Sequence, residues 1–133
     1  MTTALDTIKT AMRLIGVLEA GEAPASDESV DALGTLNAML AGFPADGIKY
    51  AHQNIDVVSD PVPMPEEQIL HVKHLLAVYL AAEYGATPSP IVMAAAENGR
   101  RYLQGVYQRA ETAPVDRYLT KPLLGSYDWT NDR

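Results

Sequence analysis

The segment 65–85 constrains the fold of this chain more than any other part of it. Its apolar residues recur at helical spacing and cover much of the helix circumference, so the helix has to be buried against several neighbours. Pro65 suits the first helical position, and Gly85 suits the end of the helix. The segment therefore predicts a central helix, whose apolar residues are Ile69, Val72, Leu75, Leu76, Ala77, Tyr79, Leu80, Ala81 and Ala82.

Two amphipathic helices are predicted before the central one. The first begins at a capping-box-like pair, Thr3 and Asp6, and ends at Gly16. The second begins at Ser26, a suitable N-cap, and ends at the sequence PADG of residues 44–47. Each helix offers one apolar side to the rest of the bundle. The residues on these sides are Leu5, Ile8, Met12 and Ile15 in the first helix and Val30, Leu33, Leu36, Leu40 and Phe43 in the second.

A fourth helix is predicted after the central one. It begins at the sequence PSP of residues 88–90 and runs to about Ala110. Gly99 and Gly105 each cost this helix about 1 kcal/mol relative to alanine, so we expect a local irregularity at 98–99. The residues expected to face inward are Ile91, Ala94 or Ala95, Tyr102 and Val106. Across the whole bundle, we expect Leu36, Leu40, Leu75, Leu76 and Tyr79 to be buried in the core.

Residues 48–59 are the part of the helical domain that does not read as helix. Ile55, Val57 and Val58 have β character, but the alternation is short and polar residues interrupt it. We therefore expect an extended arm or one strand of a small hairpin, followed by a stiff connector over the proline-rich residues 61–65.

Helical periodicity disappears after Pro114, yet the segment that follows is rich in aromatic residues. It holds the only Trp of the chain and two of its seven Tyr. Trp and Tyr dominate interface hot spots, so this composition indicates an anchor peptide; a tail that folds back on its own bundle is an equal alternative. We expect an all-α fold, a small bundle of about four main helices over residues 1–113 with an extended C-terminal tail over 114–133. The candidate partner-binding residues of the tail are Tyr118, Leu119, Leu123, Leu124, Tyr127 and Trp129.

The charge of the chain is unevenly distributed. The net charge is −7, with eleven acids and three bases in residues 1–67 but six acids and seven bases in residues 68–133. Because Lys and Arg supply most of the affinity for phosphate, such a chain is expected to bind duplex DNA weakly. It suits a surface past which DNA slides. The absence of Cys excludes disulfides, thiolate metal sites and cysteine nucleophiles.

One group of residues has the spacing of a metal site. Glu67, His71 and His74 lie on one side of the central helix, but the two histidines are not four residues apart as in a zinc-protease motif, and a fourth ligand is missing. We interpret them as partly exposed polar residues of a packed helix. The alternative is a metal-dependent enzyme.

The basic residues of the fourth helix are the other candidate for chemistry. Arg100, Arg101 and Arg109 could contact a phosphate, but we expect them to pair with acids of a neighbouring helix. The sequence contains no glycine-rich phosphate loop and no serine in a nucleophile elbow. We therefore predict a structural or interaction protein that is not an enzyme and needs neither a cofactor nor a metal.

Three stretches of the chain, AMRLIGVL near the N-terminus, residues 26–47 with the sequence ALGTLNAML, and residues 65–90 with the sequence AAEYGATPSP, are informative when taken in order. Together they resemble phage head-to-tail adaptor proteins, the tail accessory or packaged-DNA stabilisation factors of short-tailed phages. Residues 26–47, SDESVDALGTLNAMLAGFPADG, resemble the family's segment ALxxLNxMLxxW…DGI. Residues 65–90, PEEQILHVKHLLAVYLAAEYGATPSP, resemble its next helix and exit, and AMRLIGVL resembles the end of its first helix. The similarity covers roughly residues 5–110. One departure is Phe43, which stands where the family usually has Trp.

The resemblance implies a place and a set of partners. Such adaptors form a ring, commonly of twelve copies, beneath the portal protein at the head–tail junction of the virion, after synthesis in the host cytoplasm. The ring extends the DNA channel, helps retain packaged DNA and docks the next tail component, a nozzle or tail protein; no membrane is involved. The rival interpretation is a bacterial cytoplasmic helical module or small regulator that binds one protein partner.

Overall fold

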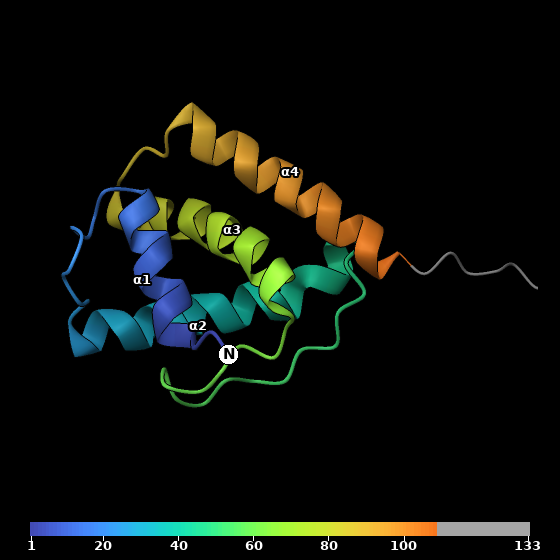
Figure 1. Cartoon of the computed structure of the whole chain (residues 1–133), viewed down its shortest axis with the longest axis horizontal. Coiled ribbons are helices and arrows are strands. Elements are labelled where there is room, and N and C mark those ends of the chain that lie inside the picture. Colours follow the sequence, from blue (N-terminus) through green and yellow to red (C-terminus); the bar gives the residue numbers. More distant parts are fainter. Residues whose placement is uncertain (109–133) are drawn as a thin grey trace, which may run out of the picture.

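A computed structural model describes residues 1–108, and within them the chain is an all-α bundle, as predicted. Its elements are α1 (Ala4–Leu14), α2 (Ser26–Gly42), the short 3₁₀-helix η1 (Phe43–Asp46), α3 (Glu66–Tyr84) and α4 (Pro90–Tyr107). Figure 1 shows α3 in the middle of the molecule, with α2 below it, α4 above it and α1 across one end. No helix in this described part has the length and apolar character needed to cross a membrane.

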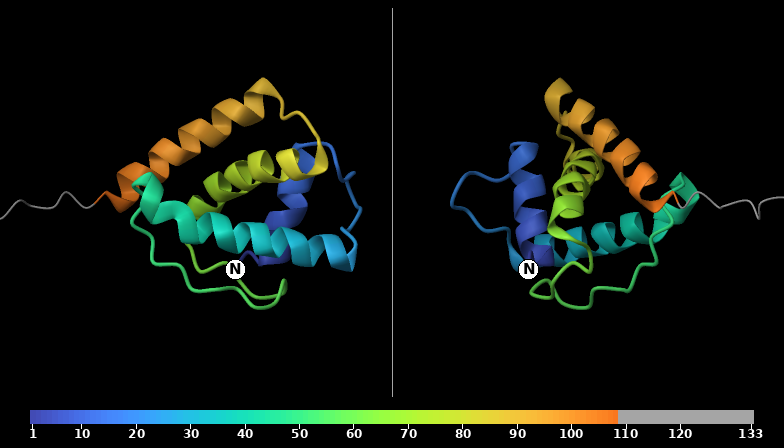
Figure 2. Two further views of the ribbon diagram at one scale, coloured as in Figure 1. Left: turned by 180° about the vertical axis from the view of Figure 1, so that it is seen from behind. Right: turned by 45° about the vertical axis from the view of Figure 1, so that its right-hand side comes forward.

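Helix α3 is the centre of the bundle, because α1, α2 and α4 all pack on it. Leu36, Leu40, Leu75 and Leu76 are buried, which confirms four of the five predicted core residues. The fifth is wrong, since the side chain of Tyr79 is 45% exposed. Figure 2 shows why: α2 and α4 diverge along one side of α3 and leave that side uncovered.

The predicted capping box begins α1. The hydroxyl of Thr3 accepts the backbone N–H of Asp6 at 3.2 Å, and the Asp6 carboxylate accepts the backbone N–H of Thr3 at 3.4 Å. The first two N–H groups of the helix donate to the carbonyls of Asp60 and Val58 at 2.9 and 2.8 Å. These are the groups that a helix start leaves without partners, so residues 58–60 complete the cap.

Of the two predicted alternatives for residues 48–59, an extended arm and a hairpin strand, the hairpin strand is not found, because the segment has no regular secondary structure. Within residues 1–108 the only strand-like pairing is a single antiparallel bridge between Thr3 and Pro61. Asn37 of α2 holds the segment against the bundle, because its amide donates to the carbonyl of Ile55 and accepts the N–H of the same residue, both at 2.9 Å. The apolar side chains that the segment and its continuation bury are Ile48, Tyr50, Ile55 and Val62.

His52 joins the same polar contact. Its Nε2 lies 2.9 Å from Oδ1 of Asn37, which is an acceptor, so Nε2 carries the proton and donates. Its Nδ1 is buried without a hydrogen-bond partner. Burial lowers the pKa of His52 below its usual value. Burial beside the loop therefore favours the neutral form of the ring.

The predicted ends of the helices are close to the observed ones. Helix α2 begins one residue away from expectation, with Ala25 as N-cap and Ser26 as its first residue, and Pro65 precedes α3 as N-cap instead of starting it. Phe43 is buried in η1, after the end of α2. Val30 is exposed, against prediction, because the bundle covers only the sides of α2 that carry Ser29, Ala32, Leu33, Leu36, Met39 and Leu40.

Helix α4 begins where it was predicted but turns a different side towards the bundle. The hydroxyl of Ser89 accepts the N–H of Val92 at 3.3 Å, and Pro90 is the first helical residue. Ile91 is 82% exposed and Tyr102 is 41% exposed, so the predicted inward side is wrong. The residues that α4 buries are Val92, Ala96, Gly99 and Leu103.

Candidate interaction surfaces

Helices α3 and α4 come close together where Gly99 meets His71. A Cβ atom at position 99 would lie 2.9 Å from the His71 Cβ and 3.3 Å from its Cα. The glycine therefore makes room for the other helix, and α4 runs without a break through the predicted irregularity. The same approach stacks the ring of Tyr102 against that of His71, with centroids 4.3 Å apart and an interplanar angle of 36°.

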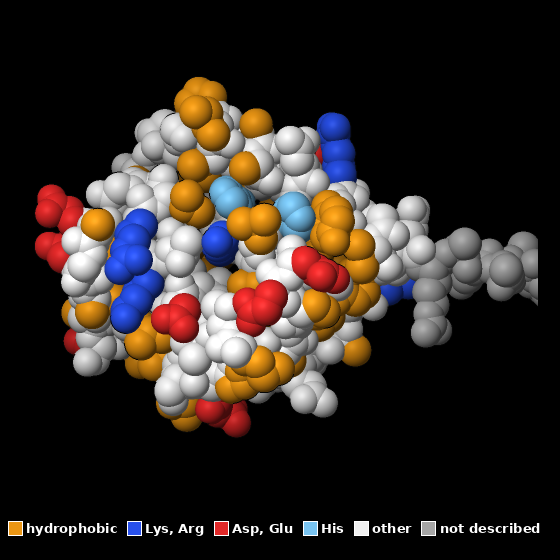
Figure 3. Space-filling model, in the orientation of Figure 1, with side chains coloured by type: hydrophobic (Ala, Val, Ile, Leu, Met, Phe, Trp, Pro, Cys, Tyr) orange, Lys and Arg blue, Asp and Glu red, His pale blue; other side chains and the backbone are white. Residues whose placement is uncertain are grey.

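This contact lies within an exposed apolar surface on the side of the molecule seen in Figure 1. Figure 3 shows hydrophobic side chains gathered around histidines over α3 and α4 on this side. On α4 the exposed side chains of Ile91, Tyr102 and Val106 recur at helical spacing and form a stripe beside the buried side of the helix. We call this surface the front face and define it by Leu70, His71, His74, Ile91, Tyr102 and Val106.

The candidate metal ligands Glu67, His71 and His74 do not converge. Nδ1 of His74 donates to the carbonyl of Leu70 at 2.8 Å, and the ring of His71 is packed on Tyr102. Among residues 1–108 no three His, Asp or Glu side chains are grouped so as to hold a metal ion. Burial, and to a lesser extent the neighbouring His74, lowers the pKa of His71. The two histidines are thus part of an apolar surface.

A groove of about 380 Å³ lies on the opposite side of the molecule, between α2 and α3. The hydroxyl of Thr35 donates to the Glu83 carboxylate at 2.6 Å across it. Its two charged lining residues, Asp46 and Glu83, are both acidic. The other residues that line the groove are Thr35, Ala38, Met39, Gly42 and Tyr79.

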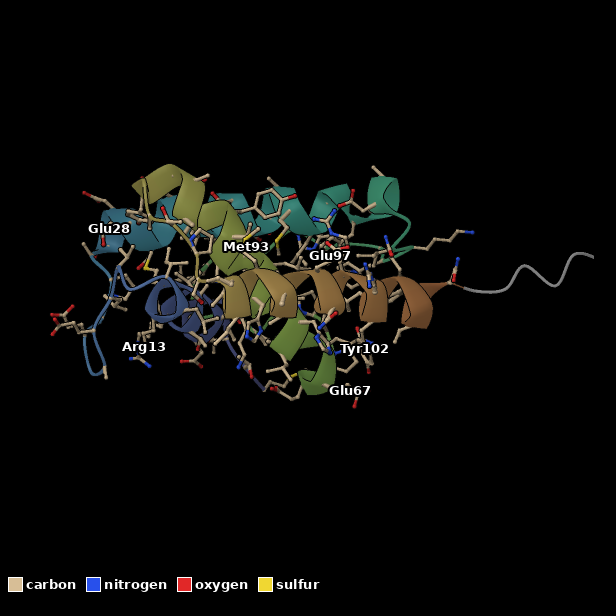
Figure 4. All side chains as sticks on the ribbon, turned by 90° about the horizontal axis from the view of Figure 1, so that it is seen from above. Arg13, Glu28, Glu67, Met93, Glu97 and Tyr102 are labelled. Atoms are coloured by element: carbon tan, nitrogen blue, oxygen red, sulfur yellow. The ribbon has the colours of Figure 1, made fainter. Side chains whose placement is uncertain are left out.

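A second groove of about 320 Å³ lies between α3 and α4, and Tyr79 lines both grooves. Its other lining residues are Leu75, Val78, Met93, Ala96, Glu97 and Arg100. We call Tyr79, the exposed Met93 and the two grooves the rear face. Figure 4, seen from above, places the labelled Met93 and Glu97 on one side of α4 and Tyr102 and Glu67 on the other. The front and rear faces thus lie on opposite sides of the α3–α4 pair.

Within residues 1–108, Arg100 and Arg101 of α4 form no ion pair with a neighbouring helix, against the prediction. Nε of Arg101 lies 3.6 Å from the carboxylate of Glu97 in the same helix, and both side chains are exposed. Such a pair contributes about 0–1 kcal/mol to stability. Arg100 lines the second groove, and Arg109 lies outside the described residues.

The last turn of α4 is anchored to the rest of the bundle. Gln104 donates to the carbonyl of Asp46 at 2.7 Å, and the hydroxyl of Tyr107 donates to the side chain of Gln68 in α3. The ring of Tyr107 packs edge-on against that of Tyr50, with centroids 5.7 Å apart. Burial, with a smaller effect of Tyr107, raises the pKa of Tyr50 to about 12.

The tail predicted to bind a partner lies outside the residues that the structure describes. This holds for all six candidate anchors, which are Tyr118, Leu119, Leu123, Leu124, Tyr127 and Trp129. The proposed division at residue 113 lies outside them as well. The anchor role of these residues therefore stays a prediction.

Sequence reasoning missed the rear face and misread the front face. The signal for the front face was present in α4, which carries two apolar stripes: Val92, Ala96, Gly99 and Leu103 form one, and the stripe of Ile91, Tyr102 and Val106 forms the other. A helix packed at the edge of a bundle buries one such stripe and leaves the other exposed.

No protein-family model matches the chain, and a search of the curated proteins finds no match to it. Its function is therefore inferred from the residues and surfaces described above.

Proposed function

We propose that this chain is a structural virion protein, a head-to-tail connector subunit that forms a ring under the portal. The observation that carries the proposal is the exposure of large apolar side chains on both sides of the α3–α4 pair. A single exposed patch serves one partner, whereas a ring subunit needs two different contact surfaces, one for each neighbour. The ring extends the DNA channel, helps retain packaged DNA and docks the next tail component.

The stretches that resemble the adaptor family support this proposal by their place in the fold. Residues 26–47 form α2 and η1, and residues 65–90 form α3 and the turn into α4. Asn37, within the LNAML sequence, makes the two hydrogen bonds that hold residue 55 against α2. The resembling residues thus include a structural polar contact as well as helix-forming apolar positions.

The charge of the chain supports a channel role. A subunit with net charge −7 repels the DNA backbone, so DNA passes through the ring with only transient, non-specific contact. In this proposal the partners are the portal protein, other copies of this chain, and a nozzle or tail protein below. The protein resides at the head–tail junction of the virion and, before assembly, in the host cytoplasm.

A second candidate function is a bacterial cytoplasmic module or regulator that binds one protein partner. The first rear groove favours it, since a groove whose two charged lining residues are both acidic fits a short basic peptide or helix. A protein of this kind stays monomeric and binds its partner one to one, which separates it from a connector. The metal-dependent enzyme is not supported, because Glu67, His71 and His74 do not converge.

Mass photometry of the full chain, alone and mixed with the portal protein of the same genome, tests the proposal. The expected result is that the mass of the portal complex increases by the mass of about one copy of this chain for each portal subunit. Negative-stain images should show an added ring at one end of the portal. A full chain that does not bind the portal at micromolar concentration contradicts the proposed function.

A further inference from the structure

The two exposed faces offer different features to a neighbouring copy. The rear face has two grooves, and Tyr79 lines both of them. The front face carries exposed apolar side chains on two helices, including Leu70 of α3 and Tyr102 and Val106 of α4. Exposed apolar side chains of one copy can fill the grooves of another, which pairs the front face with the rear face.

The charges of the two faces are also complementary. The first rear groove is lined by two acids, Asp46 and Glu83, and the second by one acid and one base, Glu97 and Arg100, so the charged lining of the rear face is mainly acidic. On the front side, Lys73 and His74 follow Leu70 by three and four positions, which places them beside it on α3. Figure 4 shows Arg13 of α1 on this side as well, together with the acid Glu67 at its edge. Opposite charges that meet across an interface steer association and fix its orientation.

The position of the faces decides the kind of assembly that such a contact makes. Identical patches that meet form a closed two-fold dimer, whereas two different patches join copies head to tail. Because the front and rear faces lie on opposite sides of the α3–α4 pair, each copy can accept one neighbour on each side. A head-to-tail contact of this kind closes into a ring when its rotation is suitable.

We propose that the front face of one copy docks into the rear grooves of the next, and that this contact holds the ring together. The inference rests on the proposed connector function and identifies the surface through which neighbouring subunits bind. Leu70, Tyr102 and Val106 are the apolar anchors on one copy, and Tyr79 and Met93 receive them on its neighbour. The acidic residues of the first groove, Asp46 and Glu83, face Lys73 and His74 across the contact.

Paired substitutions on each face test this contact. A front variant carries Leu70→Glu and Val106→Glu, and a rear variant carries Tyr79→Glu and Met93→Glu. Each places two carboxylates in an apolar contact, and we expect a loss of self-association of at least about tenfold. The matched control carries Val17→Glu and Val57→Glu, which replace exposed valines of the loops. Far-UV circular dichroism and thermal melting verify that all three variants fold.

Mixing the two variants gives the decisive outcome. The front variant keeps an unchanged rear face, and the rear variant keeps an unchanged front face. If the contact is head to tail, these two unchanged faces can still bind each other in the mixture. We therefore expect a one-to-one dimer in the mixture, no assembly of either variant alone, and full rings of the control on the portal. Complete rings of either variant overturn the inference while leaving the connector function standing. If the wild-type chain does not bind the portal, the proposed function fails instead.

Cross-linking provides a second measurement that does not depend on destabilising the contact. The chain has no natural Cys, so Tyr79→Cys and Tyr102→Cys can be introduced singly and oxidised on the portal. A covalent dimer is expected only when the two single variants are mixed. A dimer that forms equally well within either single variant contradicts the head-to-tail arrangement.

Discussion

The contact between Gly99 and His71 leads to a prediction in which two effects on stability oppose each other. Alanine at position 99 favours the helix by about 1 kcal/mol relative to glycine. Its Cβ, however, would lie 2.9 Å from the Cβ of His71 and 3.3 Å from its Cα, so α3 and α4 have to move apart. Inserting a methyl group into such packing costs about 1–3 kcal/mol, so we expect a net loss between about zero and 2 kcal/mol.

Gly105 is the matched control, because it lies in the same helix and, apart from its own helix, no residue of 1–108 has an atom within 4 Å of the position of an added Cβ. Gly105→Ala keeps the gain in helix propensity without the clash and should stabilise the protein by up to about 1 kcal/mol. The two variants should thus differ by about 1–3 kcal/mol, the size of the clash alone. Gly34→Ala in α2, also with open space around it, repeats the control in another helix.

Urea unfolding followed by far-UV circular dichroism measures this difference as a shift in the midpoint at constant slope. Removing the His71 ring should not abolish this effect. In a His71→Ala background Gly99→Ala should cause the same loss of stability, because the Cβ and Cα atoms of residue 71 that clash with the added methyl group remain. If Gly99→Ala stabilises the protein as much as Gly105→Ala does, the helices are not in close contact at this point and the reasoning is wrong.

Four further predictions concern other parts of the molecule. Leu76→Ala, at a fully buried position, should lower the free energy of unfolding by about 2–5 kcal/mol in urea titrations. Asn37→Ala should cost about 1–3 kcal/mol for each backbone group of Ile55 that it leaves unpaired, and hydrogen exchange at the Ile55 amide should accelerate. Burial lowers the folded-state pKa of His52, so stability should be constant above pH about 6.5 and fall as the pH drops through that lowered pKa; an NMR titration that finds a normal pKa contradicts this. Deleting residues 115–133 should leave the melting temperature almost unchanged and abolish attachment to the portal; a truncated protein that unfolds or docks normally refutes the anchor role.

The beginnings and ends of the helices can be read closely from the sequence, although Ser26 and Pro65 were each placed one position away from their observed roles. The capping box of Thr3 and Asp6, the helix-ending glycines Gly16 and Gly85, and the start of α4 at residues 88–90 were all predicted where the structure has them. Each depends on hydrogen bonds and backbone angles within a few residues, and such short-range interactions can be read directly from neighbouring residues. The number of helices and the central place of α3 were also determined by the sequence, through the distribution of apolar residues.

The surfaces that carry the proposed function were decided by the tertiary structure. Tyr79 and Tyr102 are apolar enough for a core, and sequence periodicity placed both of them inside. Tyr79 is exposed because α2 and α4 diverge beside it. Tyr102 is exposed because α4 turns Gly99 towards α3 at the close contact with His71. Which of two apolar stripes a helix buries depends on the shape of the helix it packs against, and that shape is set by residues far away in the chain.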